Sequence, residues 1–164
     1  MVLDILRTYC APRRILRQRI GDTVREDRAL ATLVAGCTLM FFAQWPRLSR
    51  EAMFDEAITL EARMAGALFG WVLVAPLVMY FLASVSHVFL RLAGSDASGY
   101  DTRMALFWAL LAAVPLWLLS GLVSGFLGHV VASAIANVFA FGGFLVFWAI
   151  GLTEISGRHK SGVV

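Results

Sequence analysis

Charged side chains are scarce in this chain. Of its 164 residues, 15% are Asp, Glu, Lys or Arg, while 60% are hydrophobic. Soluble globular domains carry about 25% charged and about 45–50% apolar residues, so this composition excludes water as the main solvent. The sequence therefore predicts an all-α fold, a polytopic membrane bundle of about four transmembrane helices preceded by a basic amphipathic surface helix.

Cysteine is nearly absent as well. Cys10 falls in the basic N-terminal segment and Cys37 in the first apolar run. A disulfide between them would have to join a surface site to the bilayer interior, so we expect two free thiols. The apolar run starts only near Ala29 and is followed by further apolar runs, which argues against a signal peptide.

Catalytic motifs are missing too. The chain has no His-Glu-x-x-His pair, no Gly-x-Ser-x-Gly turn and no phosphate-binding glycine loop. The serines of residues 94–99 have no histidine base nearby and lie among turn formers, so a flexible loop is expected there. We expect no enzyme, no metal and no cofactor. Haem is disfavoured because His87 and His129 are predicted at opposite membrane faces.

Long uncharged stretches are what the chain does contain. About twenty helical residues cross the hydrocarbon core. The predicted spans are residues 29–45, 64–90, 105–126 and 130–152, within a membrane domain of residues 22–153. Residues 1–21 form the N-terminal segment and residues 154–164 a tail. Pro76 predicts a kink in the second span.

The basic residues indicate the orientation. Thirteen of the fourteen are Arg, and seven precede residue 29. With the N-terminus inside, eleven basic residues lie on the cytoplasmic side, against three outside, namely Arg47, Arg50 and Arg63. Both termini are therefore expected in the cytoplasm, with the chain in the inner membrane.

The N-terminal segment has an apolar edge and a basic edge. The arginines of the basic edge are Arg7, Arg13, Arg14, Arg17 and Arg19. Such a helix is expected to lie flat on the anionic inner leaflet, and a docking surface for another protein is the alternative. Nucleic acid is not expected as a partner, because no recognition helix or aromatic platform accompanies the patch.

Two glycine pairs have the Gly-x-x-x-Gly spacing. Gly66 and Gly70 fall in the second span, and Gly121 and Gly125 in the third. Small residues at this spacing let helix backbones approach closely in lipid. The contact is either with another helix of the same chain or with a second copy.

Polar residues within the spans are few. Those singled out are Ser84, Ser86 and His87 in the second span, Ser120 in the third, and Ser133 and Asn137 in the fourth. No Asp, Glu, Lys or Arg accompanies them, so ion-coupled transport is disfavoured. We expect them to form interhelical hydrogen bonds or interface contacts.

Three short segments carry a family resemblance. They are residues 25–30 (Arg-Glu-Asp-Arg-Ala-Leu), 43–48 (Ala-Gln-Trp-Pro-Arg-Leu) and 105–109 (Ala-Leu-Phe-Trp-Ala). Over roughly residues 12–152 the chain resembles small bacterial membrane proteins of the Yip family, named for Ypt/Rab-interacting eukaryotic relatives. The resemblance implies a multi-span bundle without known catalytic residues. Yip domains are usually described with five spans, whereas this sequence predicts about four.

Two functions remain open from the sequence. The first is a non-enzymatic scaffold or accessory subunit of a membrane protein complex, which binds a membrane-protein partner or a second copy through its helix faces. The alternative is a small-solute transporter or channel, lined by Asn137, Ser133, Ser84 and His87.

Overall fold

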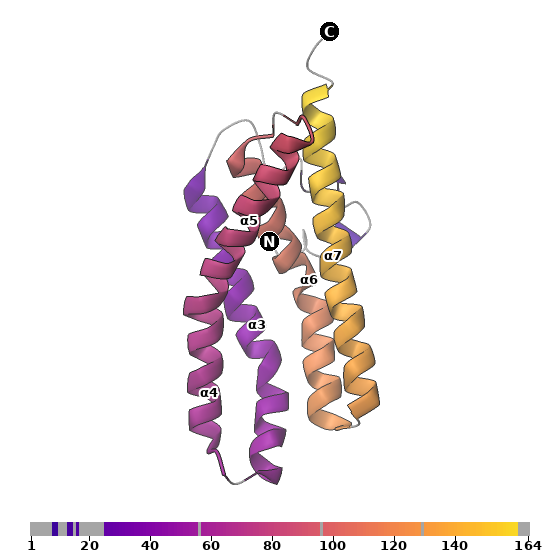
Figure 1. Cartoon of the computed structure of the whole chain (residues 1–164). Helices are drawn as coiled ribbons and strands as arrows, with labels where there is room; N and C mark the ends of the chain where they lie inside the picture. Colours follow the sequence, from indigo (N-terminus) through magenta and orange to yellow (C-terminus); the bar gives the residue numbers. More distant parts are fainter. Residues whose placement is uncertain are drawn as a thin grey trace.

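The computed structural model describes residues 8–9, 13–14, 16, 25–55, 57–95, 97–128 and 130–160, with side chains through residue 156. Over these residues the chain is helical and contains no strand. By length and composition, four of its helices are able to cross a membrane (Figure 1). The predicted all-helical fold with four membrane-spanning helices is confirmed, and the chain is a multi-pass membrane protein.

The helices run up and down in a bundle. Their bounds are α3 Glu26–Phe54, α4 Leu60–Phe69, η1 Gly70–Val74, α5 Ala75–Leu92, α6 Gly99–Phe126 and α7 Val130–Lys160. The segments α4, η1 and α5 form one continuous span, Leu60–Leu92. We call the end at which α3 turns into α4 and α6 into α7 the hairpin end; it lies at the bottom of Figure 1.

Helix α3 continues beyond the predicted end of the first span at residue 45. It passes through Pro46 and ends at Phe54. Two contacts hold its last turns: Arg47 pairs with Glu51 one turn on, and Arg50 donates a hydrogen bond to the carbonyl oxygen of Gly125 at 3.4 Å. Packing on α6 thus stabilises a helix that a proline would otherwise weaken by about 3 kcal/mol.

The second span bends without ending. Its residues Gly70–Val74 form a π-helical turn, in which the N–H of Ala75 donates to the carbonyl oxygen of Gly70. Pro76 follows at the start of α5 and has no N–H to donate. The wider turn accommodates the proline within a continuous span, as π-bulges do.

Helix α6 is the central helix. In its most apolar window 56% of the residues are buried, compared with 6% for the α4–α5 span and 11% for α7. Its residues from Met104 to Val114 are all buried. Ser98 caps its start by accepting from the N–H of Asp101 at 3.1 Å, and Arg103 pairs with Glu26 of α3.

Two glycines of α6 allow α3 to pack directly on its backbone. A Cβ added at Gly121 would overlap the carbonyl oxygen of Ala43. A Cβ at Gly125 would lie 2.5 Å from the Cβ of Pro46. These two positions therefore serve packing within the chain.

The other glycine pair lies free. A Cβ added at Gly66 or at Gly70 would meet no atom within 4 Å. No described residue of the chain therefore packs onto this face of the α4–η1 segment.

Two described residues of the N-terminal segment, Tyr9 and Leu16, lie against the helical bundle. The hydroxyl of Tyr9 donates to the carbonyl oxygen of Ala112, half-way along α6, at 3.0 Å. The Tyr9 ring also packs edge-on against Phe147 of α7. Leu16 is buried, and it lies close to Gly151. A hydrogen bond and close packing therefore hold these described residues against α6 and α7, and the sequence analysis expected this segment at the leaflet surface.

The contrast between the two glycine pairs predicts opposite effects of the same substitution. We expect Gly121→Ala to destabilise the bundle by about 1–3 kcal/mol, because the methyl group forces α3 away from α6. Thermal or denaturant unfolding of the purified chain in detergent, followed by circular dichroism, measures the change.

Gly66→Ala is the matched control. It adds the same methyl group in open space and should leave stability unchanged or raise it by up to about 1 kcal/mol through helix propensity. Equal destabilisation by both variants would contradict the close α3–α6 contact.

Candidate functional site: a polar cavity at the hairpin end

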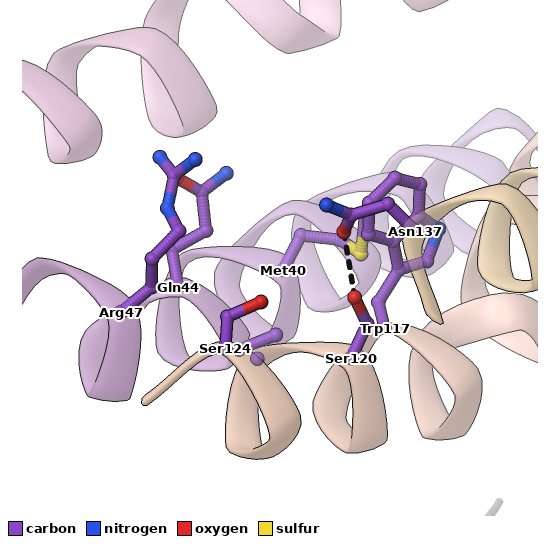
Figure 2. Close-up of a pocket in the computed structure, with 9 residues that line it drawn as sticks. Met40, Gln44, Arg47, Trp117, Ser120, Ser124 and Asn137 are labelled. Carbon is purple, nitrogen blue, oxygen red and sulfur yellow. Dashed lines mark hydrogen bonds between the residues drawn. The ribbon is translucent and has the colours of Figure 1, made fainter. Parts of the chain in front are cut away.

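A small cavity lies between α3, α6 and α7 near the hairpin end. Its volume is about 70 Å³ (Figure 2). The lining consists of Met40, Ala43, Gln44, Arg47, Trp117, Ser120, Gly121, Ser124 and Asn137. Five of these nine residues carry polar side chains, which is unusual within spans as apolar as these.

Helical periodicity brings the lining residues together. On α3 they lie at positions 40, 43, 44 and 47, and on α6 at positions 117, 120, 121 and 124. Residues three and four apart share one helix face, so each helix presents a single stripe to the other. Helix α7 adds Asn137. The close approach at Gly121 sets the two stripes against each other.

One hydrogen bond joins two residues of the cavity lining. The hydroxyl of Ser120 donates to Oδ1 of Asn137 at 2.6 Å and so joins α6 to α7. For Ser120 and Asn137 the sequence predicts interhelical hydrogen bonds or interface contacts, and this bond is of the first kind. Ser133 lies half-buried one turn earlier and makes no side-chain hydrogen bond with any described residue.

Several polar groups of the lining remain without protein partners. Gln44, Ser124 and the amide nitrogen of Asn137 make no hydrogen bond with the described part of the chain. Ser124 is only 7% exposed. In Figure 2 the amide of Gln44 lies beside the guanidinium of Arg47. The cavity therefore offers unused hydrogen-bonding groups next to a cation.

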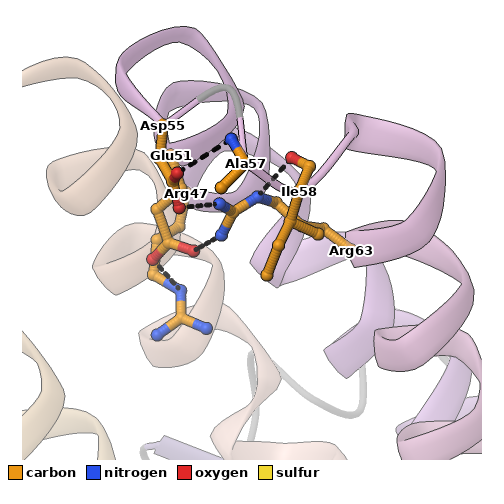
Figure 3. A network of polar contacts seen from close by, with 6 residues as sticks. All are labelled: Arg47, Glu51, Asp55, Ala57, Ile58 and Arg63. Carbon is orange, nitrogen blue, oxygen red and sulfur yellow. Dashed lines mark hydrogen bonds and ion pairs between the residues drawn. The ribbon is translucent and has the colours of Figure 1, made fainter.

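An ion-pair network lies at the hairpin end, outside the cavity. Arg63, whose side chain is 13% exposed, pairs with Asp55 and, at 3.5 Å, with Glu51 (Figure 3). Its Nε donates to the carbonyl oxygen of Ile58 at 3.2 Å. Glu51 also pairs with Arg47 at 3.5 Å. The network links the turn after α3 to the rim of the cavity.

Asp55 is the titrating group of this network. The backbone N–H of Ala57 donates to its carboxylate at 3.1 Å, and the Arg63 guanidinium adds a second hydrogen bond and a positive charge. These interactions, with the Ala57 bond first, lower the pKa of Asp55.

The predicted polar residues of α5 lie apart from the cavity. The hydroxyls of Ser84 and Ser86 donate to the carbonyl oxygens of Tyr80 and Leu82, one turn back on their own helix. The ring of His87 lies beside Gly99 at the start of α6, and its Nδ1 is buried without a partner in the described residues. The structure therefore does not place Ser84 or His87 beside Asn137. His129 lies outside the described residues.

The arginines of the N-terminal segment are only partly described. Arg13 and Arg14 are exposed, and Nε of Arg13 lies 3.9 Å from a carboxylate oxygen of Glu154. Arg7, Arg17 and Arg19 lie outside the described residues.

No metal site is apparent in the part of the chain that the structure describes. No three His, Cys, Asp or Glu side chains come together there. In comparisons with known proteins, the chain matches no protein-family model, no curated protein and no solved structure.

Sequence reasoning missed three residues of the cavity: Gln44, Arg47 and Ser124. A signal for Ser124 was present, since Ser120 and Ser124 each precede a glycine of the Gly121–Gly125 pair. Gln44 is the last residue but one of the predicted first span, and Arg47 lies beyond its end. The continuation of α3 through Pro46 is what places them on the cavity face.

The Ser120–Asn137 hydrogen bond predicts a measurable coupling. A double-mutant cycle of Ser120→Ala and Asn137→Leu should give about 0.6 kcal/mol of interaction energy, the average for such bonds in membrane proteins. Unfolding in detergent micelles measures it. Strictly additive effects of the two variants would contradict a stabilising bond.

The network at the hairpin end predicts an acid-sensitive turn. The pKa of Asp55 should lie below the ordinary value of about 3.9. Because the folded pKa is the lower one, the stabilisation is present above the unfolded pKa and is lost as pH falls through the folded pKa. Carboxyl carbon NMR during a pH titration measures this value.

Arg63→Gln provides the comparison. Removal of the guanidinium should raise the pKa of Asp55 toward its ordinary value, while the Ala57 hydrogen bond keeps part of the shift. An unchanged titration curve would show that Arg63 does not act on Asp55 in solution.

Proposed function

We propose that the chain is a non-enzymatic scaffold or accessory subunit of a membrane protein complex, similar to the Yip family, in the inner membrane. Both termini lie in the cytoplasm in this proposal. The excess of arginine on that side of the membrane supports the orientation. The hairpin end then faces away from the cytoplasm, with its three arginines partly neutralised by Glu51 and Asp55.

The observation that carries the proposal is the unoccupied face of the α4–η1–α5 span. Gly66 and Gly70 leave open space along it, and only 6% of the apolar window of this span is buried. A shallow groove of about 330 Å³ continues from Gly70 along the π-helical turn. It is lined by Gly70, Trp71, Val74, Ala75, Val78 and Met79.

The physics of helix association in lipid favours a protein partner at this face. Lipid tails are as apolar as leucine, so helices associate through close packing and not through the hydrophobic effect. In this chain the Gly121–Gly125 pair already shows such packing, with α3 as its partner. The Gly66–Gly70 pair presents the same spacing with no described helix against it. The exposed side of α7 carries bulky residues instead, such as Phe139 and Val138, and suits lipid.

Purification from the native membrane tests the proposal. The tagged chain is extracted in polymer nanodiscs, and the proteins that accompany it in fixed ratio are identified by mass spectrometry. A stoichiometric membrane-protein partner, or a second copy, supports the proposal. Recovery as a monomer alone contradicts it and favours a small-solute transporter or channel, for which the polar cavity would be the first place to look.

The Gly66–Gly70 face predicts which variants lose the partner. Gly66→Leu combined with Gly70→Leu should reduce partner recovery at least tenfold, because the larger side chains hold a neighbouring helix away. Gly142→Leu on α7 is the matched control, since a Cβ there also meets open space. Equal recovery with all variants would place the interface elsewhere.

A further inference from the structure

We propose that the polar cavity binds the phosphodiester headgroup of a phospholipid from the leaflet at the hairpin end. This ligand site does not depend on the identity of any protein partner. The depth of the cavity, the chemistry of its lining and its size all suit such a ligand.

The cavity lies at the depth of the lipid headgroups. Trp45 is 46% exposed on the outer face of α3, where it stacks on Phe42, and tryptophan is enriched at the membrane–water interface. Arg47 lies two residues further out. Ser120 lies six residues before the end of α6 at Phe126, or roughly 9 Å at 1.5 Å per residue. The cavity therefore extends from the interface to the upper part of the acyl chains, since the interfacial layer is about 5–8 Å thick.

The lining suits a phosphate ester. The Nε of Arg47 is paired with Glu51, whereas its two terminal nitrogens have no partner among the described residues and are able to donate to one anion. The amide groups of Gln44 and Asn137 and the hydroxyl of Ser124 supply further donors. No carboxylate lines the cavity. The donors and the single cation together match an anionic, oxygen-rich ligand.

The polar groups of the lining are accessible to a ligand. Ser124 is 7% exposed, and its hydroxyl makes no hydrogen bond with the described chain, so it is free to bind a ligand or water in the cavity. Gln44 is half-buried, while Arg47 and Asn137 are exposed, so a ligand outside the bundle can reach them. One water molecule needs roughly 10–15 Å³ of cavity volume. The cavity volume of about 70 Å³ therefore has room for several water molecules, or for one phosphate group in their place.

A lipid fits better than a free anion because the site is half apolar and lies within the spans. Met40 and Trp117 line it beside the polar groups. A phosphodiester with attached acyl chains arrives at this depth with its apolar part already in hydrocarbon. A free phosphate ion would have to leave water for it.

Native mass spectrometry of the purified, delipidated chain in detergent tests the proposal. The probes are dioleoyl phosphatidylglycerol, dioleoylglycerol, which has the same chains without the phosphate, and inorganic phosphate. We expect one tightly bound phosphatidylglycerol and at least tenfold weaker binding of dioleoylglycerol, because only the former supplies an anion to Arg47. Equal binding of the two lipids would overturn the proposal. Displacement by inorganic phosphate at equal concentration would also overturn it, since the ligand would then be a free anion.

Variants locate the site. Arg47→Gln should weaken phosphatidylglycerol binding about tenfold, while Arg91→Gln, an exposed arginine in the last turn of α5, should leave it unchanged. Ser124→Ala keeps the Cβ, removes a cavity hydroxyl and should weaken binding severalfold without touching the Arg47–Glu51 pair. Thermal unfolding of each variant shows that it is folded. Unaltered binding by folded Arg47→Gln and Ser124→Ala would place the lipid elsewhere and overturn the assignment.

Discussion

The contact between α3 and α6 at two glycines is the constraint on which the rest of the structure depends. Because the backbone of α3 lies against Gly121 and Gly125, the two helices pack closely at the hairpin end. Arg50 then reaches the carbonyl oxygen of Gly125, and α3 continues as a helix through Pro46. In lipid, where burial of apolar surface gives no preference for one helix over another, shape and hydrogen bonding have to determine the arrangement.

The same contact accounts for the polar cavity. Two backbones that approach this closely bring short polar side chains on adjacent stripes face to face, and Ser120, Ser124 and Gln44 lie on those stripes. Helix α7 completes the site through the hydrogen bond between Asn137 and Ser120. Packing and polarity are therefore parts of one feature: the glycines make the contact, and the residues beside them give it its chemistry.

The class of fold could be predicted from the sequence, whereas the residues of the polar cavity could not. Apolar runs and Gly-x-x-x-Gly spacings predict a four-helix membrane bundle, because helix length and hydropathy are local properties. Which glycine pair would pack within the chain was open from the sequence, since Gly66–Gly70 and Gly121–Gly125 look alike. Arg47 was missed because a proline next to a charge resembles the end of a span, and Gln44 was missed because it lies at the very end of the predicted span. The hydrogen bond of Tyr9 to Ala112 was not predicted, because it joins residues far apart in the sequence that no local pattern connects.

The burial of α6 has a consequence for the biogenesis of the protein. Its most apolar window is as apolar as that of the α4–α5 span, of which only 6% is buried within the chain, with a mean hydropathy of 2.1 in both. The insertion machinery selects segments by hydropathy, so it has no means of distinguishing the core helix from a peripheral one. Membrane insertion and assembly of the bundle are therefore separate events, and a chain with a bulky residue at Gly121 would be threaded through the bilayer correctly yet remain a set of loose helices. Its presence in the membrane fraction would therefore show insertion and would not show that the bundle has assembled.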